Sequence, residues 1–194
     1  MRPVIRHGVF PEQRAQAARL YWQAFGGKLG MVMGPEPKAM AFIERVMAPD
    51  HVISASDEAG ALLGVIGYRT ARGSFVGGRM SDLIAVYGRF GAWWRAHALG
   101  VLAEDLEPGT IAVDGLAVAE GARGAGVGAA LVEALSAEAA MRGFARLRLE
   151  VIGENLRARA LYDRLGFEVT ARCESRVKAL IFGYRSSLTM VRHL

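Results

Sequence analysis

A glycine-rich loop between a strand and a helix constrains this chain more than any other feature. Apolar alternation predicts a strand over Thr110–Val118, and the glycines fall in a loop over Glu120–Gly128 that leads into a helix over Ala129–Met141. Glycine lets the backbone turn sharply and approach a ligand without an intervening side chain. The free N–H groups at the start of a helix attract anions. The segment therefore predicts an α/β fold with an anion site, for which a pyrophosphate is the natural occupant.

Two phosphate-binding patterns fit this loop incompletely. A Walker loop ends in Gly-Lys-Ser/Thr, whereas Gly128 is followed by two alanines, so that class is excluded. A dinucleotide-binding fingerprint matches loosely as Gly124-x-Gly126-x-x-Ala129, with Glu150 about 20 residues further on. Against it, several residues separate the apolar strand from the first of these glycines, and too little chain follows for the rest of a doubly wound sheet. A nicotinamide-dependent oxidoreductase is therefore kept only as an alternative.

A third pattern fits the loop and its surroundings. Arg123-x-x-Gly126-x-Gly128 resembles the acetyl-CoA motif of the GNAT acyltransferases, Gln/Arg-x-x-Gly-x-Gly/Ala. The resemblance is sharp over residues 110–172, compatible over 1–70 and absent over 71–109, and Glu120 stands where the family commonly has proline. A second family signature is matched at every fixed position by Asn155-x-x-Ala158-x-x-Leu161-Tyr162-x-x-x-Gly166-Phe167.

The resemblance implies a GNAT acyl-CoA N-acyltransferase fold, which is an α/β fold with a mixed central sheet flanked by helices. We expect one domain over residues 1–194, with an extra helical insertion at about 71–109. Further strands are expected at 4–10, 51–56, 61–70, 145–152, 167–171 and 188–191. Further helices are expected from Pro11 to a stop at Gly26-Gly27, and over 37–47, 81–103 and 155–165. Residues 28–35, 72–78 and 173–187 are expected to be loops.

The same resemblance assigns roles toward acetyl-CoA as co-substrate. The backbone of Leu116, Ala117 and Val118 would hold the pantetheine arm as an added strand, and the Val118 N–H would stabilise the oxyanion. Asn155 would contact the pantetheine arm, and Tyr162 would donate a proton to the departing thiolate. The pyrophosphate would lie on the backbone of Arg123, Gly124, Ala125, Gly126, Val127, Gly128 and Ala129.

Direct attack by an amine also needs a group that takes the amine's proton, since an aliphatic amine is mostly protonated at neutral pH. Glu150 is one candidate, because it lies at the interval before Tyr162 at which GNATs that acetylate protein N-termini carry a glutamate. Asp114 is the other, because a carboxylate in an otherwise apolar strand is costly unless it faces a cleft. A water chain without a single base stays open as a third possibility.

Composition and charge limit the classes of partner and the compartment that we expect for this chain. The net charge is +5, but basic and acidic residues are interspersed, which does not indicate nucleic-acid binding. The mean hydropathy of +0.21 raises a membrane question, yet no window has the ~18 uninterrupted apolar residues of a spanning helix, and no apolar signal segment is apparent. The single cysteine, Cys173, excludes an internal disulfide, and the four histidines show no metal spacing. We expect a cytoplasmic protein without a metal.

The resemblance to the GNAT family implies an N-acetyltransferase. The acetyl group would move from acetyl-CoA to a primary amine, on a small molecule or a protein N-terminus, through a tetrahedral intermediate. An alternative from another class is a GNAT-like module that binds acyl-CoA as a sensor or partner domain without turnover. A homodimer is possible through the helix expected at 81–103, and the identity of the acceptor is left open.

Overall fold

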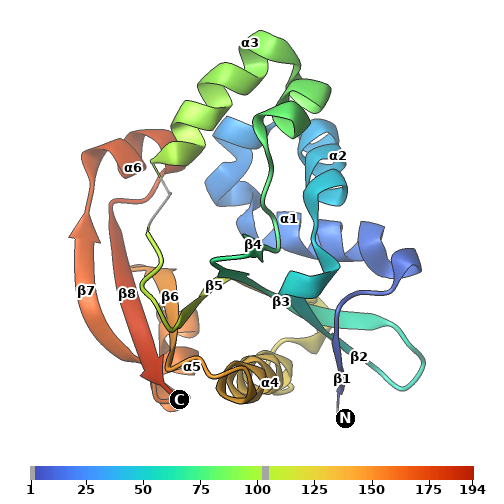
Figure 1. Cartoon of the computed structure of the whole chain (residues 1–194), viewed down its shortest axis with the longest axis vertical. Coiled ribbons are helices and arrows are strands. Elements are labelled where there is room, and N and C mark those ends of the chain that lie inside the picture. The colour runs from blue at the N-terminus through green and yellow to red at the C-terminus, as the bar shows by residue number, and fades with distance from the viewer. Residues whose placement is uncertain (1–2, 102–104) are drawn as a thin grey trace.

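One mixed sheet organises the computed structural model, which describes residues 3–101 and 105–194 (Figure 1). Within those residues the strand order is β1-β2-β3-β5-β6-β8-β7, with the short β4 beside β3. The strands are β1 (Val4–His7), β2 (Val52–Ser56), β3 (Leu62–Thr70), β4 (Gly73–Ser74), β5 (Thr110–Val118), β6 (Arg146–Ile152), β7 (Glu168–Glu174) and β8 (Ser186–His193). The helices are α1 (Arg14–Met33), α2 (Glu36–Val46), α3 (Met80–Gly100), α4 (Val127–Met141), α5 (Leu156–Arg164) and α6 (Arg176–Phe182).

The first half of the sheet is an antiparallel meander. Strands β1, β2 and β3 pair in sequence order, and the predicted hairpin between β2 and β3 is confirmed. Its turn closes with a hydrogen bond from the Asp57 N–H to the Ala61 carbonyl, and Gly60 has a φ of +85° that few other residues adopt. β3 then pairs with β5, which carries the chain into the glycine-rich loop.

The sheet forks between β5 and β6, its only parallel pair in the described residues. The two strands are paired from Thr110–Arg146 to Val113–Leu149, and beyond that point they separate. β6 stays fully paired with β8 on its other side, and β5 stays paired with β3. In the β3–β5 ladder, Val113 pairs with Tyr68 and Gly115 with Gly67, so Asp114 is an extra residue in a β-bulge at the mouth of the fork.

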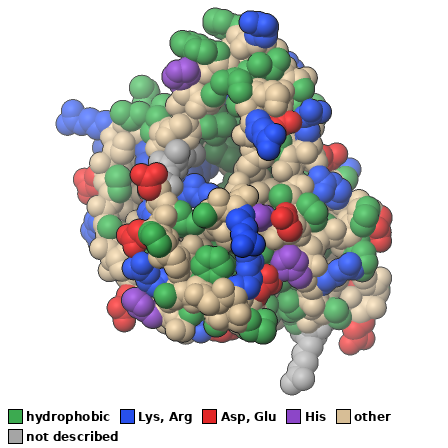
Figure 2. Space-filling view, in the orientation of Figure 1, with side chains coloured by type: hydrophobic (Ala, Val, Ile, Leu, Met, Phe, Trp, Pro, Cys, Tyr) green, Lys and Arg blue, Asp and Glu red, His purple; other side chains and the backbone are tan. Residues whose placement is uncertain are grey.

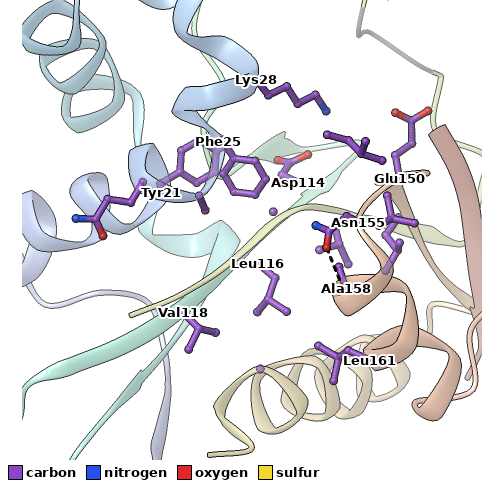
Figure 3. A pocket seen from close by; sticks show the side chains of 18 of the residues that line it. Tyr21, Phe25, Lys28, Asp114, Leu116, Val118, Glu150, Asn155, Ala158 and Leu161 are labelled. Carbon is purple, nitrogen blue, oxygen red and sulfur yellow. Dashed lines mark hydrogen bonds between the residues drawn. The ribbon is translucent and has the colours of Figure 1, made fainter. Parts of the chain in front are cut away.

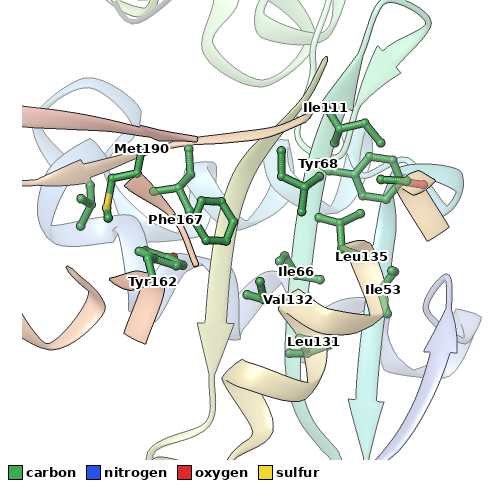
Figure 4. Packing of buried hydrophobic residues seen from close by; sticks show 14 of the residues in the cluster. Ile53, Ile66, Tyr68, Ile111, Leu131, Val132, Leu135, Tyr162, Phe167 and Met190 are labelled. Atoms are coloured by element: carbon green, nitrogen blue, oxygen red, sulfur yellow. The ribbon is translucent and has the colours of Figure 1, made fainter. Parts of the chain in front are cut away.

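Helices cover both faces of the sheet. On one face, α4 lays Leu131, Val132 and Leu135 on the strands, and this cluster also takes in Tyr162 and Phe167 (Figure 4). On the other face, α1 packs on β3 and β5 through a second cluster. This layering confirms the predicted mixed α/β class. The assignment of residues 1–194 to one domain stays a prediction.

The predicted end of the first helix at Gly26-Gly27 is wrong, because α1 continues to Met33. Each internal glycine costs a helix about 1 kcal/mol relative to alanine. Packing outweighs that cost here, since Val32 and Met33 are buried in a third cluster together with residues of α2, α3 and α6. The helix ends at Gly34, because the following proline disfavours helical backbone in the residue before it.

The predicted loop over 173–187 is also partly wrong, because it contains α6 and extensions of β7 and β8. The Ser175 hydroxyl accepts the Lys178 N–H at the start of α6, and Gly183, in the left-handed conformation, ends it. Serine before a helix and glycine after it are recognised capping signals, so this helix could have been predicted. The predicted loop at 72–78 similarly contains β4.

Helix α3 forms the top of the molecule in Figure 1. It begins at Met80, is kinked at Gly88 and packs Leu83, Tyr87 and Ala92 into the third cluster. The helix expected over 81–103 is therefore present to Gly100, and the last part of that expectation, residues 102–103, lies outside the described residues. Through this packing the 71–109 segment is joined to α1 and α2 beside the fork.

The packing of α4 gives a test of the core. Leu135 is fully buried, so Leu135→Ala should lower the free energy of unfolding by about 2–5 kcal/mol through lost transfer energy and a residual cavity. Met141 is on the same helix and 82% exposed, and Met141→Ala should change that free energy by no more than about 0.5 kcal/mol. Urea denaturation of the two variants measures both values, and equal losses would contradict the described orientation of α4.

Candidate active site

A cavity of about 820 Å³ occupies the fork between β5 and β6. Figure 3 shows side chains converging on it from α1, β5, β6 and α5. One half lies against the glycine-rich loop and α5, and the other half is walled by aromatic and apolar side chains of α1 and α2. The predicted site residues whose side chains or backbone line it are Asp114, Leu116, Val118, Arg123, Gly124, Gly126, Gly128, Ala129, Glu150, Asn155 and Tyr162.

Three predicted cofactor-binding residues are not part of this lining. Ala117 and Val127 are 1% exposed, and their side chains face the core. Ala125 is exposed, and its N–H is already donated to the Ala122 carbonyl. Any contact of Ala117 or Val127 with a ligand would therefore come from the backbone.

The glycine-rich loop presents backbone rather than side chains. Gly124 and Gly126 have φ values of +87° and +83°, a left-handed conformation that favours glycine. A Cβ on Gly126 would meet no atom within 4 Å, so the conformation and not the available space requires glycine there. The Ala130 N–H is donated to the Gly126 carbonyl, which leaves the first N–H groups of α4 without a helical acceptor. These groups can bind an anion.

One edge of β5 is open toward the cavity. The Ala119 N–H is donated to Leu63 of β3, and backbone groups of successive residues in a strand point to opposite sides. The N–H groups of Leu116 and Val118 therefore point away from β3, into the fork. Arg123 Nε donates to the Val118 carbonyl at 3.1 Å, which ties the loop to the strand. An extended ligand can pair with this edge as a short added strand.

Asn155 has a structural role that the sequence pattern did not show. Its Oδ1 accepts the Ala158 N–H at 3.1 Å and caps α5 (Figure 3). The capping bond uses the oxygen of the amide, so Nδ2 is the atom that can donate to a ligand in the cavity.

Tyr162 is buried near the C-terminal end of α5. Its ring packs on Phe167 with centroids 5.6 Å apart, and burial raises its pKa to about 12. The phenol therefore keeps its proton at neutral pH and can act as a donor.

Asp114 projects into the cavity from the bulge in β5 (Figure 3). Its Oδ2 is buried and has no hydrogen-bond partner among the described residues, and its Oδ1 is 3.9 Å from Arg69 Nε. Burial raises the pKa of Asp114 to about 6, against the opposing effects of Arg69, the Phe75 backbone and His51. The carboxyl group therefore changes its protonation state close to neutral pH.

Glu150 enters the cavity from β6, where Leu147, Leu149 and Val151 face the core on the opposite side as predicted. Its Oε1 is 3.5 Å from Nζ of the buried Lys178 in α6. This carboxylate is therefore already engaged by a cation, unlike Oδ2 of Asp114.

Lys28 is a cavity residue that the sequence analysis missed. It lines the apolar half, and burial lowers its pKa while Glu150 opposes that change. The sequence pattern predicts a loop for this segment, which gives Lys28 no position on a helix face. The signal was the spacing of Tyr21, Phe25 and Lys28, which places all three on one face of a continuous helix.

Phe25 also explains a glycine in β5. A Cβ on Gly115 would lie 2.5 Å from the Phe25 ring, so glycine is needed there for space. The ring rests directly on the strand next to Asp114 and closes one side of the cavity (Figure 3).

The described residues also bear on metal binding and on insertion into a membrane. Across residues 3–101 and 105–194, no three His, Cys, Asp or Glu side chains are grouped so that they could hold a metal ion. None of the helices described there is long and apolar enough to cross a membrane. On the face in Figure 2, Lys and Arg side chains are scattered among Asp and Glu.

The family model described as the acetyltransferase (GNAT) family matches residues 14–167, and the chain belongs to that family. A comparison with curated protein sequences finds no significant match. The family membership makes the protein an acetyltransferase and confirms the predicted fold.

Solved structures agree with this assignment of the fold. A GCN5-related N-acetyltransferase from Kribbella flavida is 17% identical with a TM-score of 0.64, covering 99% of this chain and 98% of its own. An N-acetyltransferase from Staphylococcus aureus Mu50 is 16% identical with a TM-score of 0.66, covering 97% and 100%. The ribosomal-protein-S18-alanine N-acetyltransferase from Escherichia coli is 16% identical with a TM-score of 0.60, covering 99% and 94%.

The cap on α5 gives a test that separates the two roles of Asn155. Asn155→Ala should lower the free energy of unfolding by about 1 kcal/mol, because the Ala158 N–H loses its acceptor. Asn155→Asp keeps an acceptor oxygen and should change that free energy by less than about 0.5 kcal/mol. Thermal and urea unfolding measure both, and a loss in the aspartate variant equal to that in the alanine variant would contradict the capping role.

Proposed function

We propose that this protein transfers an acetyl group from acetyl-CoA to a primary amine bound in the apolar half of the cavity. The observation that carries the proposal is the open edge of β5, which runs from Asp114 at the mouth of the fork to the glycine-rich loop. Acetyl-CoA supplies an activated acyl group as a thioester. Family membership supports it as the co-substrate, and the donors along this edge fit its polar groups.

Backbone groups along the open edge of β5 and in the glycine-rich loop match successive parts of acetyl-CoA. The N–H groups at the start of α4 and in the loop over Arg123–Ala129 suit a pyrophosphate, apart from those of Arg123 and Ala125, which donate to the Glu120 and Ala122 carbonyls. The N–H group of Val118 suits an amide group of a pantetheine arm, and Nδ2 of Asn155 can add a bond from the opposite wall. Within this arrangement the Leu116 N–H, which is nearer to Asp114 than the Val118 N–H expected from the family resemblance, is the donor for the oxyanion that develops during attack.

Asp114 is the better placed of the two predicted bases. Its Oδ2 has no hydrogen-bond partner in the described residues and its Oδ1 is 3.9 Å from Arg69 Nε, whereas Glu150 is closer to a cation, with Oε1 3.5 Å from Lys178 Nζ. Asp114 also has a pKa of about 6, so most of it is ionised at pH 7 and its basicity exceeds that of an ordinary carboxylate. We assign Asp114 to take the proton of the amine, and Glu150 to hold Lys178 in position.

Tyr162 acts on the leaving group of the reaction, the CoA thiolate. Its phenol is protonated at neutral pH, because burial raises its pKa to about 12. It donates its proton to the thiolate sulfur as the bond from carbon to sulfur breaks, and recovers one from solvent afterwards. The ammonium form of the amine loses two protons in all: Asp114 takes one before attack, and the second leaves the nitrogen of the tetrahedral intermediate for solvent. The sulfur gains one proton from Tyr162, which solvent replaces, and Asp114 later releases its own, so the reaction yields the amide, CoA thiol and one net proton.

The base assignment predicts a specific pH dependence. Asp114 accepts a proton only when ionised, so log kcat/KM for the amine should fall more steeply with decreasing pH below about 6. Asp114→Asn should abolish this inflection and lower kcat/KM at pH 7.5 by about 10²- to 10⁴-fold. Glu150→Gln is the matched control and should retain the inflection. Release of CoA thiol measures each profile, and loss of the inflection in the Glu150 variant alone would reverse the assignment.

The role of Tyr162 predicts a separation between turnover and binding. Tyr162→Phe removes the proton donor but keeps the packing on Phe167, so kcat should fall by about 10²-fold. The Kd for acetyl-CoA should stay within about twofold of the wild-type value. Thiol release and calorimetric titration give the two numbers. Unchanged turnover would show that another group protonates the sulfur.

A further inference from the structure

Lys28 places a cation in the half of the cavity where the amine is proposed to bind. It extends from α1 across the cavity, toward the wall that carries Glu150 (Figure 3). Tyr21 and Phe25 precede it on the same helix face, and both also line the cavity. The cavity therefore has the carboxylate of Asp114 where the acetyl transfer is proposed to occur and the ammonium group of Lys28 on another side.

The ammonium group of Lys28 is not neutralised by a carboxylate of the described residues. No carboxylate there is within ion-pair distance of its Nζ, and the acidic neighbour that acts on it, Glu150, contacts Lys178. Its Nζ lies over the ring face of Tyr184, 4.8 Å from the ring centroid. A cation–π contact recovers only part of the hydration that a half-buried ammonium loses.

Tyr184 carries a second unsatisfied group next to Lys28. The residue is 5% exposed, and its hydroxyl oxygen is buried without a hydrogen-bond partner among the described residues. Burial and the nearby Glu150 raise its pKa to about 12, so the hydroxyl keeps its proton. Tyr184 does not line the cavity, so its ring contacts Lys28 from outside the cavity and its hydroxyl is not offered to a ligand there.

We propose that the acceptor is an amine that also carries a carboxylate, an amino acid or a close analogue, and that Lys28 binds this carboxylate. The amine and the carboxylate of such a molecule lie close together, so within the one cavity that both residues line it can direct its amine toward Asp114 and its anionic group toward Lys28. Its apolar body contacts Phe25, Leu29 and Met33. An amine without an anionic group would bring only positive charge to the same space. This inference rests on the proposed function and names its substrate class.

Matched acceptors test the proposal directly. Free amino acids with aromatic or branched side chains are compared with their amides and with their decarboxylated amines, so that only the carboxylate differs. Wild-type protein should use the acids with a kcat/KM at least about 10-fold above the other two forms. Lys28→Met should reduce kcat/KM for the acids by about 10- to 100-fold and for the amides by less than about threefold. The preference for the carboxylate should therefore disappear.

Two control variants distinguish charge from folding. Lys28→Arg keeps the cation and should retain at least part of the preference. Lys38→Met removes an exposed lysine of α2 and should leave all three classes of acceptor unchanged. As a readout without turnover, 3-phenylpropanoate, which has the carboxylate but no amine, should inhibit the wild-type protein in competition with the acceptor and inhibit Lys28→Met at least about 10-fold more weakly.

The outcomes separate this inference from the proposed function. Equal use of acids, amides and amines by wild-type protein, or an equal loss for all three in Lys28→Met, would overturn the role of Lys28 while acetyl transfer stands. Acetylation of peptide N-termini without acetylation of free amino acids would make the acceptor a protein and overturn the proposal. If acetyl-CoA binds but no amine of any class releases CoA, the proposed function fails, and this inference fails with it.

Discussion

The loss of pairing between β5 and β6 after Val113 and Leu149 is the constraint on which the site depends. A sheet normally satisfies its backbone groups strand by strand, and here one edge of β5 is left open while both strands remain anchored on their outer sides. The bulge at Asp114 marks the point of separation. The fork thereby creates the cavity, an edge that can pair with an extended ligand, and a place for a carboxylate that would be too costly inside a closed sheet.

The elements around the fork each satisfy a different requirement. The left-handed conformations of Gly124 and Gly126 turn the chain from β5 into α4, and the start of that helix provides N–H groups at the far end of the open edge. Helix α5, capped by Asn155, places Tyr162 on the opposite wall. Helix α1 closes the remaining side, where the missing side chain of Gly115 makes room for the Phe25 ring. The acceptor half is therefore built mainly by α1, outside the two sequence motifs.

The sequence analysis was accurate around the two sequence motifs and less accurate for the acceptor half of the cavity. β5 was predicted with its observed bounds and the α4–β6–α5 region to within two residues, because apolar alternation, glycines and the two motifs agree there. The course of α1 beyond Gly26-Gly27 could not be read from local propensity, since the packing of Val32 and Met33 against distant helices decides it. That error also hid Lys28. The burial of Asp114 and the pairing of Glu150 with Lys178 depend on contacts between elements far apart in the chain, which residue spacing does not encode.

The central claim is that acetyl-CoA binds along the open edge of β5 with its pyrophosphate on the glycine-rich loop. Calorimetric titration of wild-type protein and of Gly126→Glu with acetyl-CoA tests it most directly, with NADH as the control ligand. The account predicts micromolar binding of acetyl-CoA to wild-type protein and no response to NADH. It predicts no measurable binding of acetyl-CoA to the variant, because a carboxylate would enter the anion site and a side chain would strain the loop. Equal affinity of the two proteins for acetyl-CoA, or saturable binding of NADH without binding of acetyl-CoA, would contradict it.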